Sequence, residues 1–163
     1  MKEAGFRVRV AGVRDLGGVV EMERGIVGAP HWAEAEYAGM LREDGGAVRR
    51  RLMVAEGQDG LVGFAVGKMV GTGPGSVAEL ESVAVRAEAR RSGVAMALCA
   101  AVVAWCRELG AGTLELEVRE GNEAAIGLYS GLGFVVVGRR RGYYREPVED
   151  AVLMRMELGD PGK

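Results

Sequence analysis

The sequence predicts an α/β protein of the α+β kind, with a mixed, mostly antiparallel sheet of about six to seven strands flanked by about four helices. Seven segments have the apolar content or polar–apolar alternation of strands, and four others carry helix-forming residues, an N-cap or a closing glycine. Glycine accounts for 27 of the 163 residues and falls largely between these segments. A strand meander precedes a β-α-β-α unit, and this order requires both parallel and antiparallel neighbours in one sheet.

The N-terminal part predicts one strand and two helices. Residues 6–10 alternate apolar and basic side chains, as a first strand does. Asp15 can cap a helix that continues to about residue 26, and Gly-Ala-Pro at 28–30 interrupts it. Residues 33–42 are rich in Ala, Glu, Leu and Met, which favours a short second helix.

The remaining chain predicts a meander and then alternating elements. Residues 51–56 and 61–70 flank a Gly-Gln-Asp-Gly turn typical of a hairpin, and residues 77–85 add a third strand. A helix, a strand, a helix and two strands joined by a polar loop follow at 94–109, 113–118, 122–132, 134–139 and 151–158. No repeat or linker divides the chain, so we expect one domain over residues 1–158 and a tail at 159–163.

Composition and charge exclude several classes of protein. With 48% hydrophobic residues and a net charge of −2, the chain can bury a core and lacks the basic balance of a nucleic-acid-binding domain. The longest apolar stretch, residues 94–105, is too short to span a bilayer. Cys99 and Cys106 would lie about 10 Å apart on one helix, too far for a disulfide. We therefore expect a reduced, cytoplasmic protein with no nucleic-acid or membrane partner, and the single histidine, His31, argues against a zinc site.

A short basic loop at residues 86–93 joins a strand to a helix. The first N–H groups of a helix have no intrahelical acceptor, so a helix that begins at a glycine can bind a pyrophosphate. Gly93 would let that backbone approach closely, Ala95 is small, and Arg90 and Arg91 add positive charge. From the residues alone, an ordinary solvated loop before a helix is an equally good interpretation.

Val83-Ala84-Val85 followed by Arg90-x-x-Gly93-x-Ala95 resembles the Q/R-x-x-G-x-G/A motif of the GNAT acetyltransferases. Arginine replaces the commoner glutamine, and alanine the commoner second glycine. The predicted order of elements is similar to the GNAT fold along the whole chain. The resemblance implies acetyl-coenzyme A as co-substrate and no metal. The residues that it places against the cofactor are Val83, Ala84, Val85, Arg90, Arg91, Ser92, Gly93, Val94, Ala95 and Asn122.

A longer match covers residues 116–134. It resembles the L-E-V-R-x-x-N-x-x-A-I-x-L-Y-x-x-L-G-F signature of the RimI-type enzymes, bacterial GNAT members that acetylate the N-terminal alanine of a ribosomal protein. Arg-Arg-Arg-Gly-Tyr-Tyr at 139–144 and Glu-Asp-Ala at 149–151 resemble that family's R-R-x-Y-Y and E-D-A. Pro-His-Trp at 30–32 resembles its P-W loop near the substrate.

This resemblance implies site residues that composition alone would not indicate. Glu117 would be the base that removes a proton from the amine, and Tyr129 the acid that protonates the departing thiolate. Without the signature, a strand glutamate is more often a solvated side chain and a helix tyrosine more often part of the core. Glu79 is a rival base, because other GNAT branches take their base from the matching strand. Ser82, where RimI-type sequences usually have asparagine, departs from the pattern.

Several questions about the acceptor stay open at the level of sequence. The resemblance implies a primary amine on a protein or peptide N-terminus, such as that of a ribosomal protein. Trp32 and Tyr143 are candidates for the acceptor groove, although either could be an ordinary packed aromatic. A small-molecule amine or lysine acetyltransferase, and a non-catalytic coenzyme-A-binding regulatory module, are the alternatives. The arginine runs at 49–51 and 139–141 are typical of a solvated face.

Overall fold

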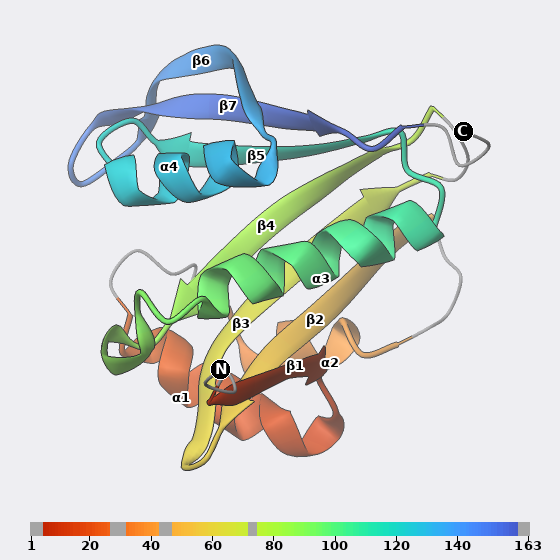
Figure 1. Ribbon diagram of the computed structural model, residues 1–163, viewed down its shortest axis with the longest axis vertical. Coiled ribbons are helices and arrows are strands. Elements are labelled where there is room, and N and C mark those ends of the chain that lie inside the picture. Colours follow the sequence, from red (N-terminus) through yellow and green to blue (C-terminus); the bar gives the residue numbers. More distant parts are fainter. Residues whose placement is uncertain (1–4, 27–31, 43–46, 72–74, 160–163) are drawn as a thin grey trace.

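The computed structural model describes residues 5–26, 32–42, 47–71 and 75–159, which form one seven-stranded sheet with helices on both faces (Figure 1). The strands are β1 (Phe6–Val10), β2 (Val48–Gly57), β3 (Gly60–Val70), β4 (Val77–Val85), β5 (Thr113–Arg119), β6 (Val135–Tyr144) and β7 (Glu149–Glu157). The helices are α1 (Leu16–Arg24), α2 (Glu34–Gly39), α3 (Val94–Glu108) and α4 (Glu123–Leu132), with 3₁₀ turns η1 (Val13–Asp15) and η2 (Ala87–Ala89).

The strand order is β1-β2-β3-β4-β5-β7-β6, and only the β4–β5 pair is parallel. The predicted fold class is therefore confirmed. Within the described ranges, no helix is long and apolar enough to cross a membrane. The predicted break at residues 28–30 and His31 lie outside the described residues.

Two strands are longer than the sequence pattern indicates, and both extend through an arginine run. β2 begins at Val48, so the arginines at 49–51 pair with β3. β6 continues to Tyr144, so the arginines at 139–141 belong to a strand and the predicted loop shortens to residues 145–148. A strand backbone can pair while long basic side chains reach solvent, so a charge run does not by itself predict a loop.

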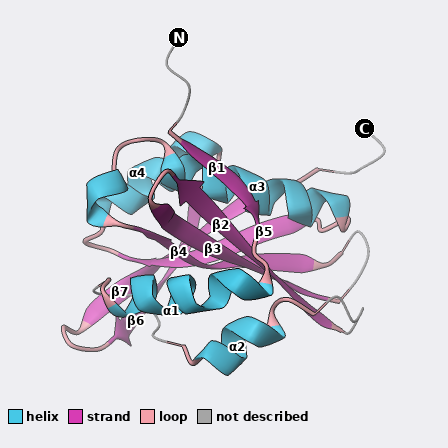
Figure 2. Ribbon diagram, turned by 90° about the horizontal axis from the view of Figure 1, so that it is seen from below, coloured by secondary structure: helices cyan, strands magenta, loops and turns pink. Residues whose placement is uncertain are grey.

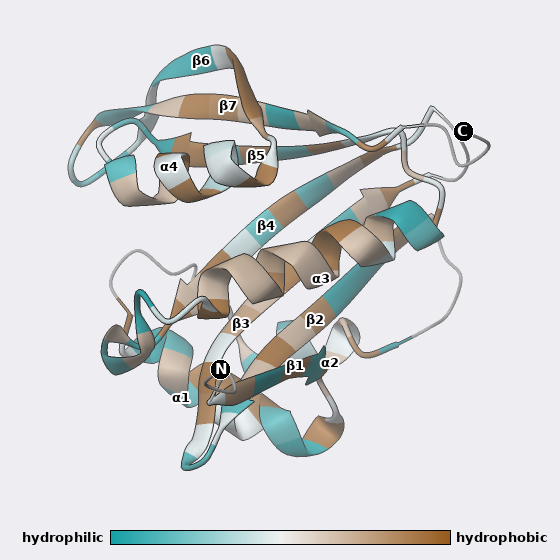
Figure 3. Ribbon diagram, viewed as in Figure 1, coloured by the Kyte–Doolittle hydropathy of each residue, from teal (hydrophilic) through white to brown (hydrophobic). Residues whose placement is uncertain are grey.

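The sheet divides the interior into two hydrophobic clusters, one on each face, and helices cover each of them. Helices α3 and α4 cover one face, and α1 and α2 cover the other (Figure 2). β2 contributes to both clusters, because Met53 and Ala55 face α3 while Leu52 and Val54 face α1, as the period of a strand requires. Apolar residues predominate along α3 and the strands behind it (Figure 3).

The parallel pair β4–β5 comes apart soon after it begins. Its paired residues run from Val77 with Thr113 only to Glu79 with Glu115. Beyond that point β4 remains paired with β3, and β5 remains paired with β7, so the two strands diverge as a fork (Figure 1). A register shift near Val66 of β3 marks the same region of β4, and such irregularities bend a strand. β4 therefore presents an edge without a partner strand beyond the fork.

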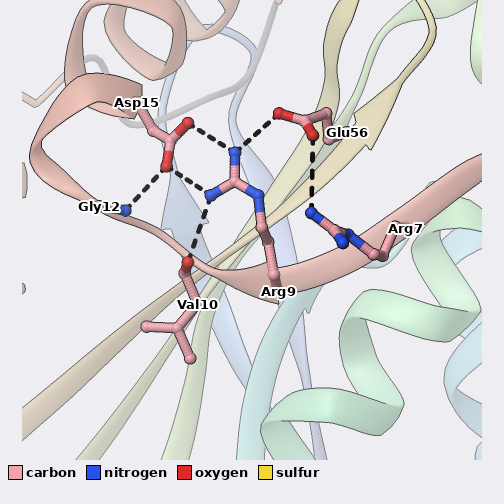
Figure 4. A network of polar contacts seen from close by, with 6 residues as sticks. All are labelled: Arg7, Arg9, Val10, Gly12, Asp15 and Glu56. Carbon is pink, nitrogen blue, oxygen red and sulfur yellow. Dashed lines mark hydrogen bonds and ion pairs between the residues drawn. The ribbon is translucent and has the colours of Figure 1, made fainter.

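A polar network ties β1 to the start of α1 (Figure 4). Arg9 donates to both oxygens of Asp15 at 2.7 and 2.9 Å and to Glu56 at 2.9 Å, and Gly12 N–H donates to Asp15 at 2.8 Å. Asp15 was predicted to cap α1. It stands at the N-cap position, but its backbone is helical and its side chain makes no capping bond to α1. The prediction of a side-chain cap is wrong because the guanidinium of Arg9 and the amide of Gly12 take the carboxylate instead.

We expect Asp15→Asn to lower the free energy of unfolding at pH 7 by about 1 to 3 kcal/mol, because a buried charge-assisted pair is lost. The hydrogen bond from Arg9 holds the pKa of Asp15 below its ordinary value. The contribution of the carboxylate is thus complete above the unfolded-state pKa of about 3.9 and is lost as the pH falls through the lower folded-state value. Urea denaturation should show the difference from wild type shrinking below about pH 4.

Glu56→Gln is the matched control, since it removes the other carboxylate bound to Arg9. The Glu56 side chain is 37% exposed and that of Asp15 only 6%, so the replacement of Glu56 should lower the free energy of unfolding by less. A difference between wild type and Asp15→Asn that stayed constant from pH 7 to pH 3 would contradict the role given to the ionised carboxylate.

Candidate active site

The predicted anion-binding turn lies at the N-terminus of α3. Gly93 has a left-handed backbone, with φ of +86°, and a Cβ there would meet nothing within 4 Å. Glycine is therefore required by backbone conformation and not by space. The first hydrogen bond of the helix runs from Ala97 N–H to Gly93 C=O at 3.0 Å. The three preceding amides, from Val94 to Met96, have no acceptor inside the helix, and Gly93 has no side chain with which to cap them.

The basic loop wraps around this helix end. Arg90 is exposed, and its Nε lies 3.4 Å from the carbonyl oxygen of Val85 at the end of β4. Arg91 is also exposed and has a positive φ of 61°, which is uncommon outside glycine. The Ser92 hydroxyl donates to the carbonyl oxygen of Ala89, which closes the turn internally. Both arginines therefore come just before the N-terminus of α3, which is the positive end of the helix dipole.

The N-terminus of α4 is built differently. Asn122 Oδ1 accepts a hydrogen bond from Ala125 N–H at 3.1 Å, so a side chain already occupies this helix end. The predicted N-cap role of Asn122 is confirmed, whereas its contact with a cofactor stays a prediction. Of the two helix ends, the one at α3 has its amides available to an anion.

The unpaired edge of β4 runs from the fork toward this helix end. The side chain of Ala84 is buried in the α1–α2 cluster, while Val83 and Val85 pack against the α3 cluster. Side chains on both faces are thus fixed in the interior. A strand directs about half of its N–H and C=O groups to each edge, so the outer edge of β4 can hydrogen-bond to an extended ligand.

A cavity of about 310 Å³ lies where β4 and β5 separate. Glu79 and Glu117, the two candidate bases, both line it. The remaining lining residues are Lys68, Val70, Val77, Ala78, Glu115, Leu116, Arg140, Leu153 and Met154. The fork therefore brings both candidate bases, which come from adjacent strands, into one cavity.

Glu117 is held by groups from β6. A guanidinium nitrogen of Arg140 lies 3.5 Å from a carboxylate oxygen of Glu117. Tyr143 is about half exposed, and the largest cause that raises its pKa is a hydrogen bond between its hydroxyl and Glu117. Arg140 also lies over the Tyr143 ring, 5.5 Å from its centroid. Tyr143 is thus placed beside the predicted base, and Arg140, from a run that is typical of a solvated face, is part of the same cluster.

Glu79 has different surroundings. Its neighbour Glu81 forms ion pairs with Arg50 at 3.2 Å and Lys68 at 3.7 Å. Among the described residues, no cation lies within 4.0 Å of the Glu79 carboxylate. Desolvation and then the charge of Glu81 raise the pKa of Glu79. The two candidate bases therefore differ in their partners: Glu117 has a cation within ion-pair distance, whereas Glu79 has none in the part of the chain that the structure describes.

Tyr129 lies on α4, on the other side of β5 from the cavity-lining carboxylates. Its ring packs against Phe134 with centroids 5.8 Å apart. Burial, followed by the neighbouring Cys99 and Tyr144, raises the pKa of the Tyr129 hydroxyl. The side chain is thus a protonated phenol at neutral pH. Tyr144 contributes to the raised pKa of Tyr129, and the pKa of Tyr144 is itself raised by burial and then by the charge of Glu117.

Trp32 lies at the other face, beside α2, with its ring centroid 5.7 Å from that of Tyr37. Its main-chain N–H donates at 2.7 Å to Glu23, a residue with 0% exposure on α1. The sequence pattern does not mark Glu23 as a functional residue. The signal that could have found it is a glutamate at a position of α1 that falls among the buried residues Val19, Val20 and Met22.

Comparisons with known proteins agree with this geometry. Residues 23–134 match the family model described as Acetyltransferase (GNAT) family. "N-alpha-acetyltransferase RimI" of Mycobacterium tuberculosis (strain ATCC 25618 / H37Rv) is 37% identical over 101 residues, which are 62% of this chain and 62% of that protein. "[Ribosomal protein bS18]-alanine N-acetyltransferase" of Escherichia coli (strain K12) is 39% identical over 83 residues, 50% of this chain and 56% of the relative. The chain thus matches somewhat more than half the length of these curated relatives.

A solved structure is similar over nearly the whole chain. The crystal structure of the ribosomal-protein-S18-alanine N-acetyltransferase from Escherichia coli has a TM-score of 0.77 and 28% sequence identity, and the match covers 94% of each chain.

The two ends of α3 offer a test of the anion site. Gly93 and Gly110 have nearly the same φ, +86° and +80°, and both have open space where a Cβ would stand. An alanine at either position should cost a similar 1 to 2 kcal/mol or so of stability. Only Gly93→Ala disturbs the free amides, so it should weaken acetyl-coenzyme A binding by about tenfold or more, whereas Gly110→Ala should leave the Kd unchanged. Isothermal titration calorimetry measures the Kd of both variants, and equal losses of affinity would remove the special role of Gly93.

Proposed function

The chain belongs to the acetyltransferase (GNAT) family, and from that premise we propose that it transfers an acetyl group from acetyl-coenzyme A to the α-amine of a protein N-terminus. The observation that carries the proposal is the arrangement around the β4–β5 fork. An uncapped helix end lies at one end of the free β4 edge, and the cavity lined by the two candidate bases lies at the other. The relatives named above as alanine N-acetyltransferases support a ribosomal-protein type of acceptor.

The residues present fit acetyl-coenzyme A as the co-substrate. Bound there, it would supply an acetyl group activated as a thioester. The amides from Val94 to Met96, with Arg90 and Arg91, suit a pyrophosphate. The free edge at Val83–Val85 suits the amides of an extended arm, which would pair as an added strand does.

Glu117 is proposed as the base that prepares the acceptor. An α-ammonium group has a pKa of about 7.7 to 8.0, so a carboxylate, acting directly or through one water, can take its proton near neutral pH. Glu117 lies two residues beyond the last β4–β5 pair, where the strands have separated. Its contacts with Arg140 and Tyr143 limit the orientation of the carboxylate. These contacts favour Glu117 over Glu79, which lies at the last pair.

Tyr129 is proposed as the acid. Its raised pKa keeps the hydroxyl protonated, so it can give a proton to the sulfur that departs when the amine takes the acetyl group. Its packing against Phe134 fixes the ring on α4. Trp32 and Tyr143 would contact the acceptor from opposite sides, one beside α2 and the other on β6.

Tyr129→Phe tests the acid. We expect kcat with an alanine-starting peptide to fall by roughly 10²- to 10⁴-fold, with little change in the Kd for acetyl-coenzyme A. Because its pKa is raised above the ordinary value of about 10, Tyr129 stays protonated through that pH. The wild-type kcat/KM should therefore rise as the acceptor amine loses its proton near pH 8 and should show no fall below about pH 10. Detecting released coenzyme A with a thiol reagent measures kcat and kcat/KM, and a fully active Tyr129→Phe would refute the assignment.

Paired substitutions distinguish the two carboxylates. Glu117→Gln should lower kcat by about 10²-fold or more, and Glu79→Gln, with its carboxylate in the same cavity, should lower it by less than about tenfold. The reverse order would make Glu79 the base. Tight acetyl-coenzyme A binding with no turnover of any amine in a broad panel, peptides included, would instead indicate a regulatory module and overturn the proposed activity.

A further inference from the structure

Glu23 is the charged residue most completely withdrawn from solvent among the described residues, with 0% exposure. It lies on α1 in the cluster that contains Val19 and Met22. One carboxylate oxygen, Oε1, accepts the main-chain N–H of Trp32 at 2.7 Å. The other, Oε2, has no hydrogen-bond partner among the described residues. Burying a carboxylate that is only partly satisfied is costly, and an apolar side chain of similar shape would pack there more favourably.

The presence of a glutamate at this buried position therefore needs a reason beyond stability. A fixed main chain at Trp32 places its ring against Tyr37, with centroids 5.7 Å apart. Tyr37 is itself fully buried and packs edge-on against Phe64 of β3 at 5.9 Å. Phe64 is the register partner of Ala84 on β4. A continuous series of contacts thus connects Glu23 to the strand whose free edge we propose holds the acetyl donor.

Tyr37 also faces the Glu23 carboxylate. Burial is the main cause that raises the pKa of the Tyr37 hydroxyl, and Glu23 raises it further. This hydroxyl, like Glu23 Oε2, has no hydrogen-bond partner within bonding geometry among the described residues. The two side chains and the Trp32 amide form one buried polar group between α1 and α2, and it stands apart from the cavity that holds Glu79 and Glu117.

We propose that Glu23 is a positioning residue for acceptor binding. Its buried carboxylate fixes the main chain at Trp32, and Trp32 forms the wall of the acceptor site on the α2 side. Glu23 thereby sets the affinity for the acceptor N-terminus without touching the reacting atoms. The inference rests on the proposed function for the identity of the acceptor, but the anchoring of Trp32 by Glu23 can be measured without any turnover.

Amide hydrogen exchange tests the anchoring. The chain has two tryptophans, so ¹⁵N-tryptophan labelling gives one backbone signal for Trp32 and one for Trp105 in α3, which serves as an internal reference. Glu23→Met removes the acceptor, and exchange at Trp32 should quicken by about tenfold or more while Trp105 is unchanged. Glu23→Gln keeps an amide oxygen for the same bond and should remain within about threefold of wild type. Unchanged exchange at Trp32 in Glu23→Met would overturn the proposal.

Steady-state kinetics test the consequence. For Glu23→Met, the KM for an alanine-starting peptide should rise by about tenfold, while kcat and the KM for acetyl-coenzyme A stay within about twofold; Glu23→Gln should restore the peptide KM. Val103→Ala in α3 is the stability control, because it loosens the opposite cluster and should leave the peptide KM unchanged. Faster exchange with an unaltered peptide KM would refute the role in acceptor binding. No turnover of peptides by wild type would instead count against the proposed function, and the exchange result would still decide whether Glu23 anchors Trp32.

Discussion

The divergence of β4 and β5 is the constraint on which the rest of the site depends. A parallel pair that kept its register would satisfy the backbone of both strands and leave no room between them. Here the pairing ends at Glu79 with Glu115, and each strand stays bound to its antiparallel neighbour. The N–H and C=O groups that lose a partner strand require another acceptor or donor. The free edge and the carboxylate cavity both follow from this one separation.

The branch of β4 beyond the fork is held by both hydrophobic clusters. Ala84 packs into the α1–α2 cluster, and Val83 and Val85 pack against α3. An edge with no strand beside it would otherwise be free to shift, whereas a binding geometry must be held to about half an ångström. The proposed acceptor side, around Trp32, and the proposed donor side, around Gly93, are therefore both supported by this one strand.

Features of the fold and site that depend on neighbouring residues could be predicted from the sequence. Features that depend on long-range contacts could not. Alternation located the strands, and the backbone demand at Gly93 and the cap at Asn122 were visible in the chain itself. The expected cap from the Asp15 side chain does not form, because its carboxylate binds Arg9 on another element. The burial of Glu23 requires knowing what covers α1. The choice between two bases could not be made from the sequence, because the β4–β5 register, which the sequence does not contain, brings both carboxylates to one cavity.

β6 forms one border of the sheet, and its outer side has no neighbouring strand in the described chain. Unprotected borders of this kind invite another polypeptide to add on, which leads to aggregation. The arginines at 139–141 lie along this border, and the pairing of β6 with β7 shifts register on both sides of it, near Gly138 and again before Tyr144. A second copy approaching edge to edge would bring like charges together along a strand that is not flat. The arginine run thus protects β6 from edge-to-edge association with a second copy. The same strand carries Arg140 and Tyr143, which reach Glu117.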